Sequence, residues 1–207
     1  IVLSSITKEE IGKLDKATFT GEIVVVDSLP QVESAVADLE QCTIIGMDTE
    51  SKPVFKKYER QSVALIQLSS ESCCYLFRIN KIGIPPRLQG LLEREDILKV
   101  GLDLCGDRRQ LRRFSKELQP QGFVDLQRLT PAYGIHDLGL QKIYAILFGE
   151  KISKRAQLTN WEAATLTPAQ QSYAALDAYA CLRIYHRLES EPMPLLHHFG
   201  LCPEQPS

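Results

Sequence analysis

Apolar residues follow one another in short runs at six places along the chain, and such runs predict β-strands. Each run spans four to six residues, a length that favours buried strands over helices. Two of the runs, 63–68 and 74–79, follow one another at hairpin spacing. The six predicted strands are residues 22–26, 42–47, 63–68, 74–79, 98–102 and 123–126.

Elsewhere the apolar residues recur at helical spacing. Val32, Ala35, Val36 and Leu39 lie on one face of a segment that Pro30 opens. Further helices are expected at residues 85–93, 107–118 and 138–148, and a long C-terminal helix is expected from about 168 to 188.

The start of the C-terminal helix carries a strong local signal. Thr167 is the predicted N-cap, Pro168 occupies the first helical position, and Gln170 completes a capping box with the threonine. Pro192 lies beyond the last helical residues, where it cannot interrupt the helix.

The order of these elements predicts one α/β domain with a mixed sheet of five or six strands, flanked by helices. The early strands pair as hairpins, and the later strands alternate with helices. We divide the chain into an N-terminal arm or short helix (1–21), the main domain (22–190) and a loosely ordered tail (191–207) that contains four prolines.

Composition narrows the function classes. A net charge of −2 over 207 residues excludes a strongly basic protein that wraps nucleic acid, but it is compatible with a nuclease whose acidic site offsets basic residues elsewhere. The apolar runs are far shorter than the ~20 residues that span a bilayer. The first residues become charged too early for a signal peptide.

The six cysteines show neither a C-x-x-C pair nor a His/Cys spacing typical of zinc sites. Cys73 and Cys74 fall in an apolar run and are expected in the core of a strand. Free buried thiols suit a reducing compartment, so we expect no structural disulfides and a cytoplasmic location.

Two acidic residues follow a predicted buried strand. Asp48 and Glu50 are separated by one residue, so their side chains point to the same side of the chain. Carboxylates this close repel one another unless a cation neutralises them, and oxygen ligands suit Mg²⁺ or Mn²⁺. A polar turn is the alternative interpretation, because D-x-E alone is a weak signal.

Three further acids stand out. Asp103 and Asp107 both follow the predicted strand 98–102, and either is a candidate, although an acid in a first helical turn is also favoured by the helix dipole. Asp177 lies among small and apolar residues of the C-terminal helix, where a buried carboxylate needs a partner. Tyr173 precedes Asp177 by four residues and therefore shares its helix face.

This ordered set (D-x-E, an aspartate at the next helix start, and Y-x-x-x-D on a late helix) resembles the DEDD exonuclease superfamily, and the tyrosine resembles its DEDDy branch. Roughly residues 22–189 are similar to RNase D and Werner-syndrome-type exonuclease domains. The segments that carry the resemblance are IIGMDTE, SVALIQLSS, KVGLDLCGDRRQL, LGLQKIYAILFG, KISKRAQLTNWEAATLTPAQ and YAALDAYA.

The resemblance implies a ribonuclease H-like fold, a 3′-5′ exonuclease domain at 22–190 and two divalent ions, Mg²⁺ or Mn²⁺. Asp107 matches the second-motif aspartate, whereas Asp103 falls at a position that the motif leaves free. Tyr173 would position the attacking water. The implied metal ligands are Asp48, Glu50, Asp107 and Asp177.

The same resemblance implies contacts with substrate. Lys154 falls at a phosphate-contacting lysine, and Thr49, Leu65 and Gln67 are assigned to substrate binding by analogy. Trp161 is expected to pack against the C-terminal helix rather than stack on a base. Further basic residues follow the D-x-E motif: Lys52, Lys56, Lys57 and Arg60.

The expected partners are single-stranded DNA or RNA, or duplexes with recessed 3′ ends, with no membrane and no small-molecule cofactor. The expected products are nucleoside 5′-monophosphates. Three alternatives stay open: RNase D-like 3′ trimming of structured RNA, a non-catalytic nucleic-acid-binding module on the same fold, and a different two-metal hydrolase.

Overall fold

A computed structural model describes residues 5–54 and 62–191 and contains one six-stranded mixed sheet. The strand order is β2-β5-β4-β3-β6-β7, and β4 runs antiparallel to both of its neighbours while the other pairs are parallel. The mixed sheet of five or six strands is thereby confirmed. The strands are β2 (Glu22–Val26), β3 (Ile44–Ser51), β4 (Val63–Ser69), β5 (Cys73–Phe77), β6 (Leu98–Gly101) and β7 (Phe123–Asp125).

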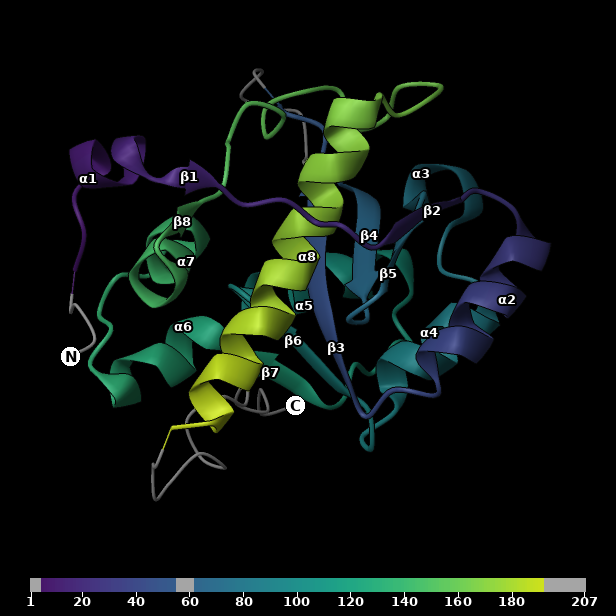
Figure 1. The fold of residues 1–207 in the computed structure, drawn as a ribbon. Helices are drawn as coiled ribbons and strands as arrows, with labels where there is room; N and C mark the ends of the chain where they lie inside the picture. The colour runs from purple at the N-terminus through teal and green to yellow at the C-terminus, as the bar shows by residue number, and fades with distance from the viewer. Residues whose placement is uncertain (1–4, 55–61, 192–207) are drawn as a thin grey trace.

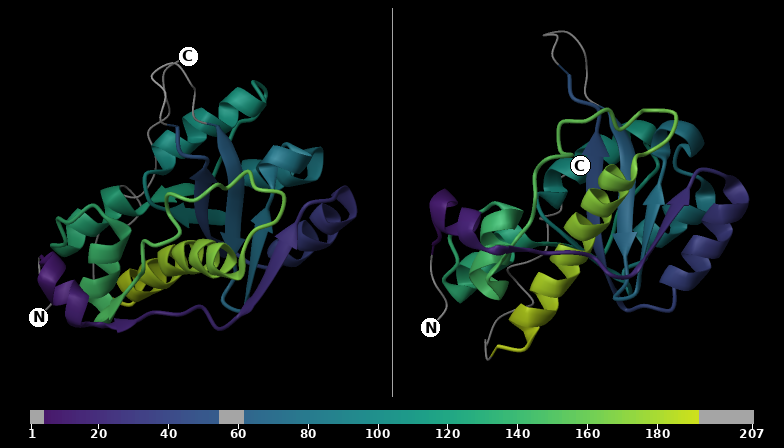
Figure 2. Two further views of the ribbon diagram at one scale, coloured as in Figure 1. Left: turned by 90° about the horizontal axis from the view of Figure 1, so that it is seen from above. Right: turned by 45° about the horizontal axis from the view of Figure 1, so that its top comes forward.

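Helices cover both faces of this sheet, as Figures 1 and 2 show. One face packs against α2 (Leu29–Leu39), α4 (Pro86–Glu93) and α5 (Leu104–Phe114). The other face is crossed by the long α8 (Pro168–Glu189), with α7 (Leu140–Phe148) beside it. Short elements complete the domain: α3 (Ile79–Ile82), α6 (Leu126–Leu129) and a 3₁₀ turn (Thr130–Tyr133).

The start of α8 forms as the sequence predicts. The Thr167 hydroxyl accepts a hydrogen bond from the Gln170 amide at 3.2 Å, and the Gln170 side chain accepts one from the Thr167 amide at 2.9 Å. Several boundaries differ from prediction by a few residues, and two of them lie beside the acidic residues. Strand β3 continues through Asp48 and Glu50 because both residues pair with the buried strand β4. Helix α5 begins at Leu104, three residues before Asp107.

The N-terminal segment is a short helix joined to the domain by a strand pair. Helix α1 (Lys8–Lys13) starts with a capping box between Thr7 and Glu10. Strand β1 (Asp15–Lys16) then pairs in parallel with β8 (Glu150–Lys151), next to α7 (Figure 1). The boundary at residue 22 stays a prediction, and the expected tail lies almost entirely outside the described residues.

Helix α8 approaches β3 unusually closely at Gly46. A Cβ atom added to Gly46 would lie 2.0 Å from the carbonyl oxygen of Ala178. Glycine is therefore the residue that lets the helix backbone touch the strand here. The contact lies one residue from Asp177 on the helix and two residues from Asp48 on the strand.

Strand β6 buries a lysine that its apolar pattern does not suggest. Lys99 is 0% exposed, and its ammonium donates hydrogen bonds to the carbonyls of Arg94 (2.5 Å) and Leu91 (3.4 Å) at the end of α4. It also lies 5.6 Å from the centre of the Phe123 ring. Burial lowers the pKa of Lys99 to about 7.

Cysteines behave as expected where the structure describes them. Cys73 and Cys74 lie in β5 and are buried, and all five described cysteines are free thiols. Over residues 5–54 and 62–191, every helix is too short or too polar to cross a membrane.

Candidate metal centre and nucleic-acid site

Three carboxylates from two elements converge beneath α8. Asp48 and Glu50 project from β3 toward the helix, and Asp177 projects back from the middle of α8. Carboxylate oxygens of all three lie within 4.8 Å of one another. Glu50 is 8% exposed and Asp177 is 6% exposed. The alternation along β3 and the depth of α8 thus bring together residues that are 129 positions apart in the chain.

Burial and like charge make this cluster electrostatically unfavourable. Burial, reinforced by the charge of Asp177, raises the pKa of Asp48 to about 8. Burial and the neighbouring carboxylates raise the pKa of Glu50 to about 10. Burial likewise raises the pKa of Asp177 to about 7, although the Tyr173 hydroxyl and the Lys154 charge act in the opposite direction. All three groups resist ionising without a nearby cation.

The cluster fits a divalent metal ion. Oδ1 of Asp177 is buried and has no hydrogen-bond partner among the described residues, so it is free to bind an ion. The donor set consists of carboxylate oxygens, which are hard ligands that suit Mg²⁺ or Mn²⁺ rather than zinc.

Asp107 lies next to the cluster and is linked to it through Thr49. The Thr49 hydroxyl donates a hydrogen bond of 2.8 Å to Oδ1 of Asp107. Burial and the charge of Asp48 raise the pKa of Asp107 to about 8. Asp103, its rival in the sequence, is exposed and occupies a left-handed conformation (φ 57°) as the N-cap of α5. Its amide donates to Asp125 at 3.1 Å, so Asp103 shapes the turn that leads to Asp107.

Tyr173 stands one helical turn before Asp177 and contacts it. A hydrogen bond from its hydroxyl lowers the pKa of Asp177, while burial raises the pKa of Tyr173 itself and keeps the phenol protonated. Trp161 packs 6.0 Å from the Tyr173 ring, is 0% exposed and donates to the carbonyl of Gln157 at 3.2 Å. The prediction that Trp161 packs against the C-terminal helix is confirmed.

Residues assigned to substrate contact occupy different environments. Lys154 is exposed, and its charge reaches Asp177. Leu65 and Gln67 are both 0% exposed in β4, opposite Glu50 and Asp48 respectively. Neither presents surface to a substrate in this structure, and their contact with nucleic acid stays a prediction.

Of the basic residues after the D-x-E motif, Lys52 lies 3.6 Å from Glu162 in an exposed ion pair. Lys56, Lys57 and Arg60 fall outside the described residues.

Arg78 was not predicted from the sequence to have a role. It is 1% exposed and donates a hydrogen bond of 2.5 Å to the carbonyl of Ala163. It anchors the loop that carries Lys154. An arginine directly after an apolar strand was the available signal.

Comparison with known proteins identifies the family. A sequence profile described as 3′-5′ exonuclease matches residues 23–192. The chain belongs to the 3′-5′ exonuclease family. Curated relatives include the mouse bifunctional 3′-5′ exonuclease/ATP-dependent helicase WRN, 37% identical over 155 residues that make up 70% of this chain and 11% of that protein. An Arabidopsis thaliana 3′-5′ exonuclease is 31% identical over 72% of this chain and 53% of its own length.

Solved structures agree on the fold of this family member. The Aedes aegypti Nibbler EXO domain superposes with a TM-score of 0.76 at 24% identity, covering 84% of this chain and 91% of that chain. Escherichia coli RNase D superposes with a TM-score of 0.73 at 24% identity, covering 81% and 44%. The ribonuclease H-like fold is thereby confirmed, whereas the chain spans only a small part of several curated relatives, about a tenth of WRN.

Proposed function

We propose that this chain hydrolyses nucleic acid stepwise from its 3′ end and releases nucleoside 5′-monophosphates. The observation that carries the proposal is the convergence of Asp48, Glu50 and Asp177 within 4.8 Å, with Tyr173 hydrogen-bonded to the last of them. Membership of the 3′-5′ exonuclease family supports the same reaction.

Asp48, Glu50, Asp107 and Asp177 are proposed to hold two divalent ions, Mg²⁺ or Mn²⁺. When bound, such ions polarise the scissile phosphate, activate a water and stabilise the leaving oxygen. Asp48, whose carboxylate lies within 4.8 Å of those of Glu50 and Asp177, would hold an ion together with them. Asp107 supports the second ion and is itself held by the Thr49 hydroxyl.

Tyr173 is proposed to orient the attacking water. Its hydroxyl keeps its proton because burial raises its pKa, and that proton is donated to Asp177. The hydroxyl oxygen is therefore left to accept a hydrogen bond from the water and orient it for attack. Lys154, exposed and within electrostatic reach of Asp177, supplies positive charge for the phosphate. Thr49, Leu65 and Gln67 complete the proposed substrate set.

The proposed substrates are single strands or recessed 3′ ends of DNA or RNA. RNase D-like trimming of RNA is the second candidate. Neighbours include a Trypanosoma brucei RNase D complex with RNA and an E. coli RNase D described as an exoribonuclease involved in structured RNA processing. Five free described cysteines support placing the chain in a reducing compartment such as the cytoplasm.

The experiment uses matched DNA and RNA oligonucleotides that carry a radioactive phosphate in the last linkage. The first labelled product should be a mononucleotide, formed with Mg²⁺ or Mn²⁺ and abolished by EDTA. Asp48→Asn is the matched negative control, since it removes one charge and keeps the shape of the side chain. If the first labelled products are longer than one nucleotide, the chain is an endonuclease rather than an exonuclease. Full activity in EDTA would overturn the proposal that the site uses divalent metal ions.

A further inference from the structure

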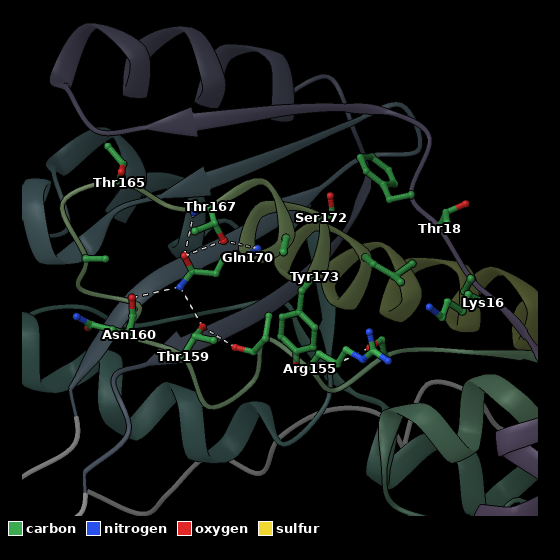
Figure 3. A pocket seen from close by; sticks show the side chains of 17 residues that line it. Lys16, Thr18, Arg155, Thr159, Asn160, Thr165, Thr167, Gln170, Ser172 and Tyr173 are labelled. Carbon is green, nitrogen blue, oxygen red and sulfur yellow. Dashed lines mark hydrogen bonds between the residues drawn. The ribbon is translucent and has the colours of Figure 1, made fainter.

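A cavity of about 620 Å³ lies beside the N-terminal half of α8 and is lined in part by Tyr173. Its walls come from three segments that are distant in the sequence: residues 16–19 of the N-terminal arm, the loop 153–167, and the first two turns of α8 (Figure 3). The volume falls in the range of about 300–1,000 Å³ that is typical of small-molecule sites.

The charged side chains that line the cavity are all positive. Lys16 and Arg155 are the charged lining residues, and the lining contains no aspartate or glutamate. Neither cation forms an ion pair with another residue of the described parts of the chain. Phe19 and Tyr173 offer aromatic rings, and alanine and leucine side chains provide further apolar surface. A ligand that fits these walls combines a flat, apolar body with an anionic group.

The cavity and the carboxylate cluster share a wall. The ring of Tyr173 lines the cavity, and its hydroxyl bonds Asp177 on the other side. In the loop, Lys154 acts electrostatically on Asp177, whereas its neighbours Ser153 and Arg155 line the cavity. The carboxylate cluster and the cations of the cavity are therefore linked through Tyr173 and through the loop residues 153–155.

The cavity is also preorganised. The Phe19 ring packs 5.1 Å from the ring of Tyr179 on α8, and the parallel β1–β8 pair holds the arm beside the loop. On the opposite wall, the Gln170 amide donates to Thr159 at 3.0 Å and to the carbonyl of Asn160 at 3.2 Å (Figure 3). A ligand would thus meet fixed walls and lose little affinity to ordering them.

We propose that this cavity is a second binding site, for a nucleoside 5′-monophosphate, separate from the carboxylate cluster. The base lies against Phe19 and Tyr173, and Arg155 and Lys16 bind the phosphate. This inference rests on the proposed function for the class of ligand, since that reaction releases such nucleotides next to the cavity.

Calorimetric titration of the full chain with AMP and dAMP in EDTA tests the site without metal-dependent binding at the cluster. Lys16→Gln/Arg155→Gln should weaken binding at least about tenfold, the loss expected for hydrogen bonds to a charged group. Ser172→Leu, which narrows the cavity at an exposed helical position, should weaken it as well. Adenosine and inorganic phosphate should each bind more weakly than AMP.

Arg112→Gln/Lys116→Gln is the matched control, because it removes the same charge at exposed positions that do not line the cavity. Equal weakening by the control would overturn the proposal in favour of long-range attraction. Loss of AMP binding in Asp177→Asn with full binding in the cavity variants would place the nucleotide at the cluster instead. If the wild-type chain binds AMP but has no nuclease activity, the proposed exonuclease function is refuted and the nucleotide site stands. If the chain is an active exonuclease but does not bind AMP, the nucleotide site is refuted and the exonuclease function stands.

A second observation concerns Gln67. Its side chain is 0% exposed, yet neither its Nε2 nor its Oε1 has a hydrogen-bond partner among the described residues. Gln67 is paired with Asp48 across β3 and β4, so both side chains project toward α8 from adjacent strands. An unsatisfied buried amide destabilises the fold, and its retention beside Asp48 calls for a reason.

We infer that Gln67 is a positioning residue, whose amide would donate a hydrogen bond to Asp48 when that carboxylate serves as a metal ligand. Gln67→Leu and Gln67→Met should then raise the thermal stability of the metal-free chain and lower its Mn²⁺ affinity by about 10–100-fold, as loss of a hydrogen bond to a ligand does. Gln67→Glu should restore affinity only where the new carboxyl is protonated, since only the protonated acid donates a hydrogen bond. If Gln67→Leu and Gln67→Met raise the thermal stability but leave Mn²⁺ affinity unchanged, Gln67 does not position Asp48 and the proposed role is overturned.

Discussion

Two of the places where the molecule buries charge differ in how that charge is partnered. Lys99, fully buried in β6, directs its ammonium at two backbone carbonyls at the end of α4. Asp48, Glu50 and Asp177 instead face one another, and no ion pair within residues 5–54 and 62–191 involves them. Burial disfavours the charged form in both places, lowering the pKa of the lysine and raising the pKa values of the acids.

The difference distinguishes a structural charge from a functional one. The lysine satisfies its donors within the fold, and the carbonyls at the end of a helix favour a cation. The acids add like charge to like charge, which the fold alone does not compensate. A buried charge that has no ion-pair partner among the described residues is therefore the better indicator of an external ligand.

The largest effect is expected from the acids. Asp48→Ala and Asp177→Ala should abolish metal binding and lower the single-turnover rate by about 10³-fold or more, since metal stabilisation of the transition state is worth several kcal/mol. Lys99→Met, equally buried, should retain the rate within about threefold. Rapid-quench assays at saturating Mg²⁺ measure both. If Lys99→Met lowers the rate as much as Asp48→Ala and Asp177→Ala do, the distinction between a structural and a functional buried charge is wrong.

Tyr173→Phe separates the ligands from the tyrosine. It removes one hydroxyl and keeps the ring, so the rate should fall by a factor on the order of 10²–10⁴ while Mn²⁺ affinity changes little. Asp103→Asn is the control, because that acid is exposed and lies outside the cluster, and most activity should remain. An inactive Asp103→Asn beside a near-normal Tyr173→Phe would contradict both assignments.

Lys99 gives a pH-dependent effect of known sign. Its pKa is about 7 in the folded chain and about 10.4 when unfolded, so the unfolded state binds more protons between these values and stability rises with pH. From pH 7 to 9, wild type should gain about 2 kcal/mol relative to Lys99→Met. Urea unfolding of both proteins across this range measures the gain, and parallel stability curves would exclude it.

The smallest effect concerns the metal-free cluster. Asp177→Asn removes one of three mutually repelling carboxylates, so in EDTA it should stabilise the chain by about 1 kcal/mol and raise Tm by about 2–4 °C. Added Mg²⁺ should reverse the order, since ligand binding stabilises only the protein that retains the site. Thermal melts with and without Mg²⁺ test this crossover. A variant that is less stable in both conditions would show that the carboxylate is structurally compensated.

Elements with a strong local signal could be predicted from the sequence. The start of α8 follows from Thr167, Pro168 and Gln170, whose capping contacts depend only on neighbouring residues. The end of β3 could not be predicted, because Asp48 and Glu50 are polar and their extended conformation is imposed by pairing with β4. The two-residue strands β1 and β8 are too short to form any periodic pattern.

In the site, too, local spacing could be predicted from the sequence whereas long-range contacts and burial could not. The spacing of Asp48 and Glu50, and of Tyr173 and Asp177, places each pair on one side of its element. Their meeting across α8 and β3 is a long-range contact that only the resemblance anticipated. The burial of Lys99 and Gln67 contradicts the usual surface preference of both residue types, so no single-sequence rule would have found it.

The missing side chain of Gly46 sets the spacing of the carboxylate cluster. With the Ala178 carbonyl only 2.0 Å from where a Cβ would stand, any other residue would push α8 outward and carry Asp177 with it. Metal–ligand distances tolerate only about 0.2 Å. The distance between the Asp48 and Asp177 carboxylates consequently depends on the backbone spacing at Gly46. A substitution at Gly46 would therefore disturb the cluster without changing any of its acids.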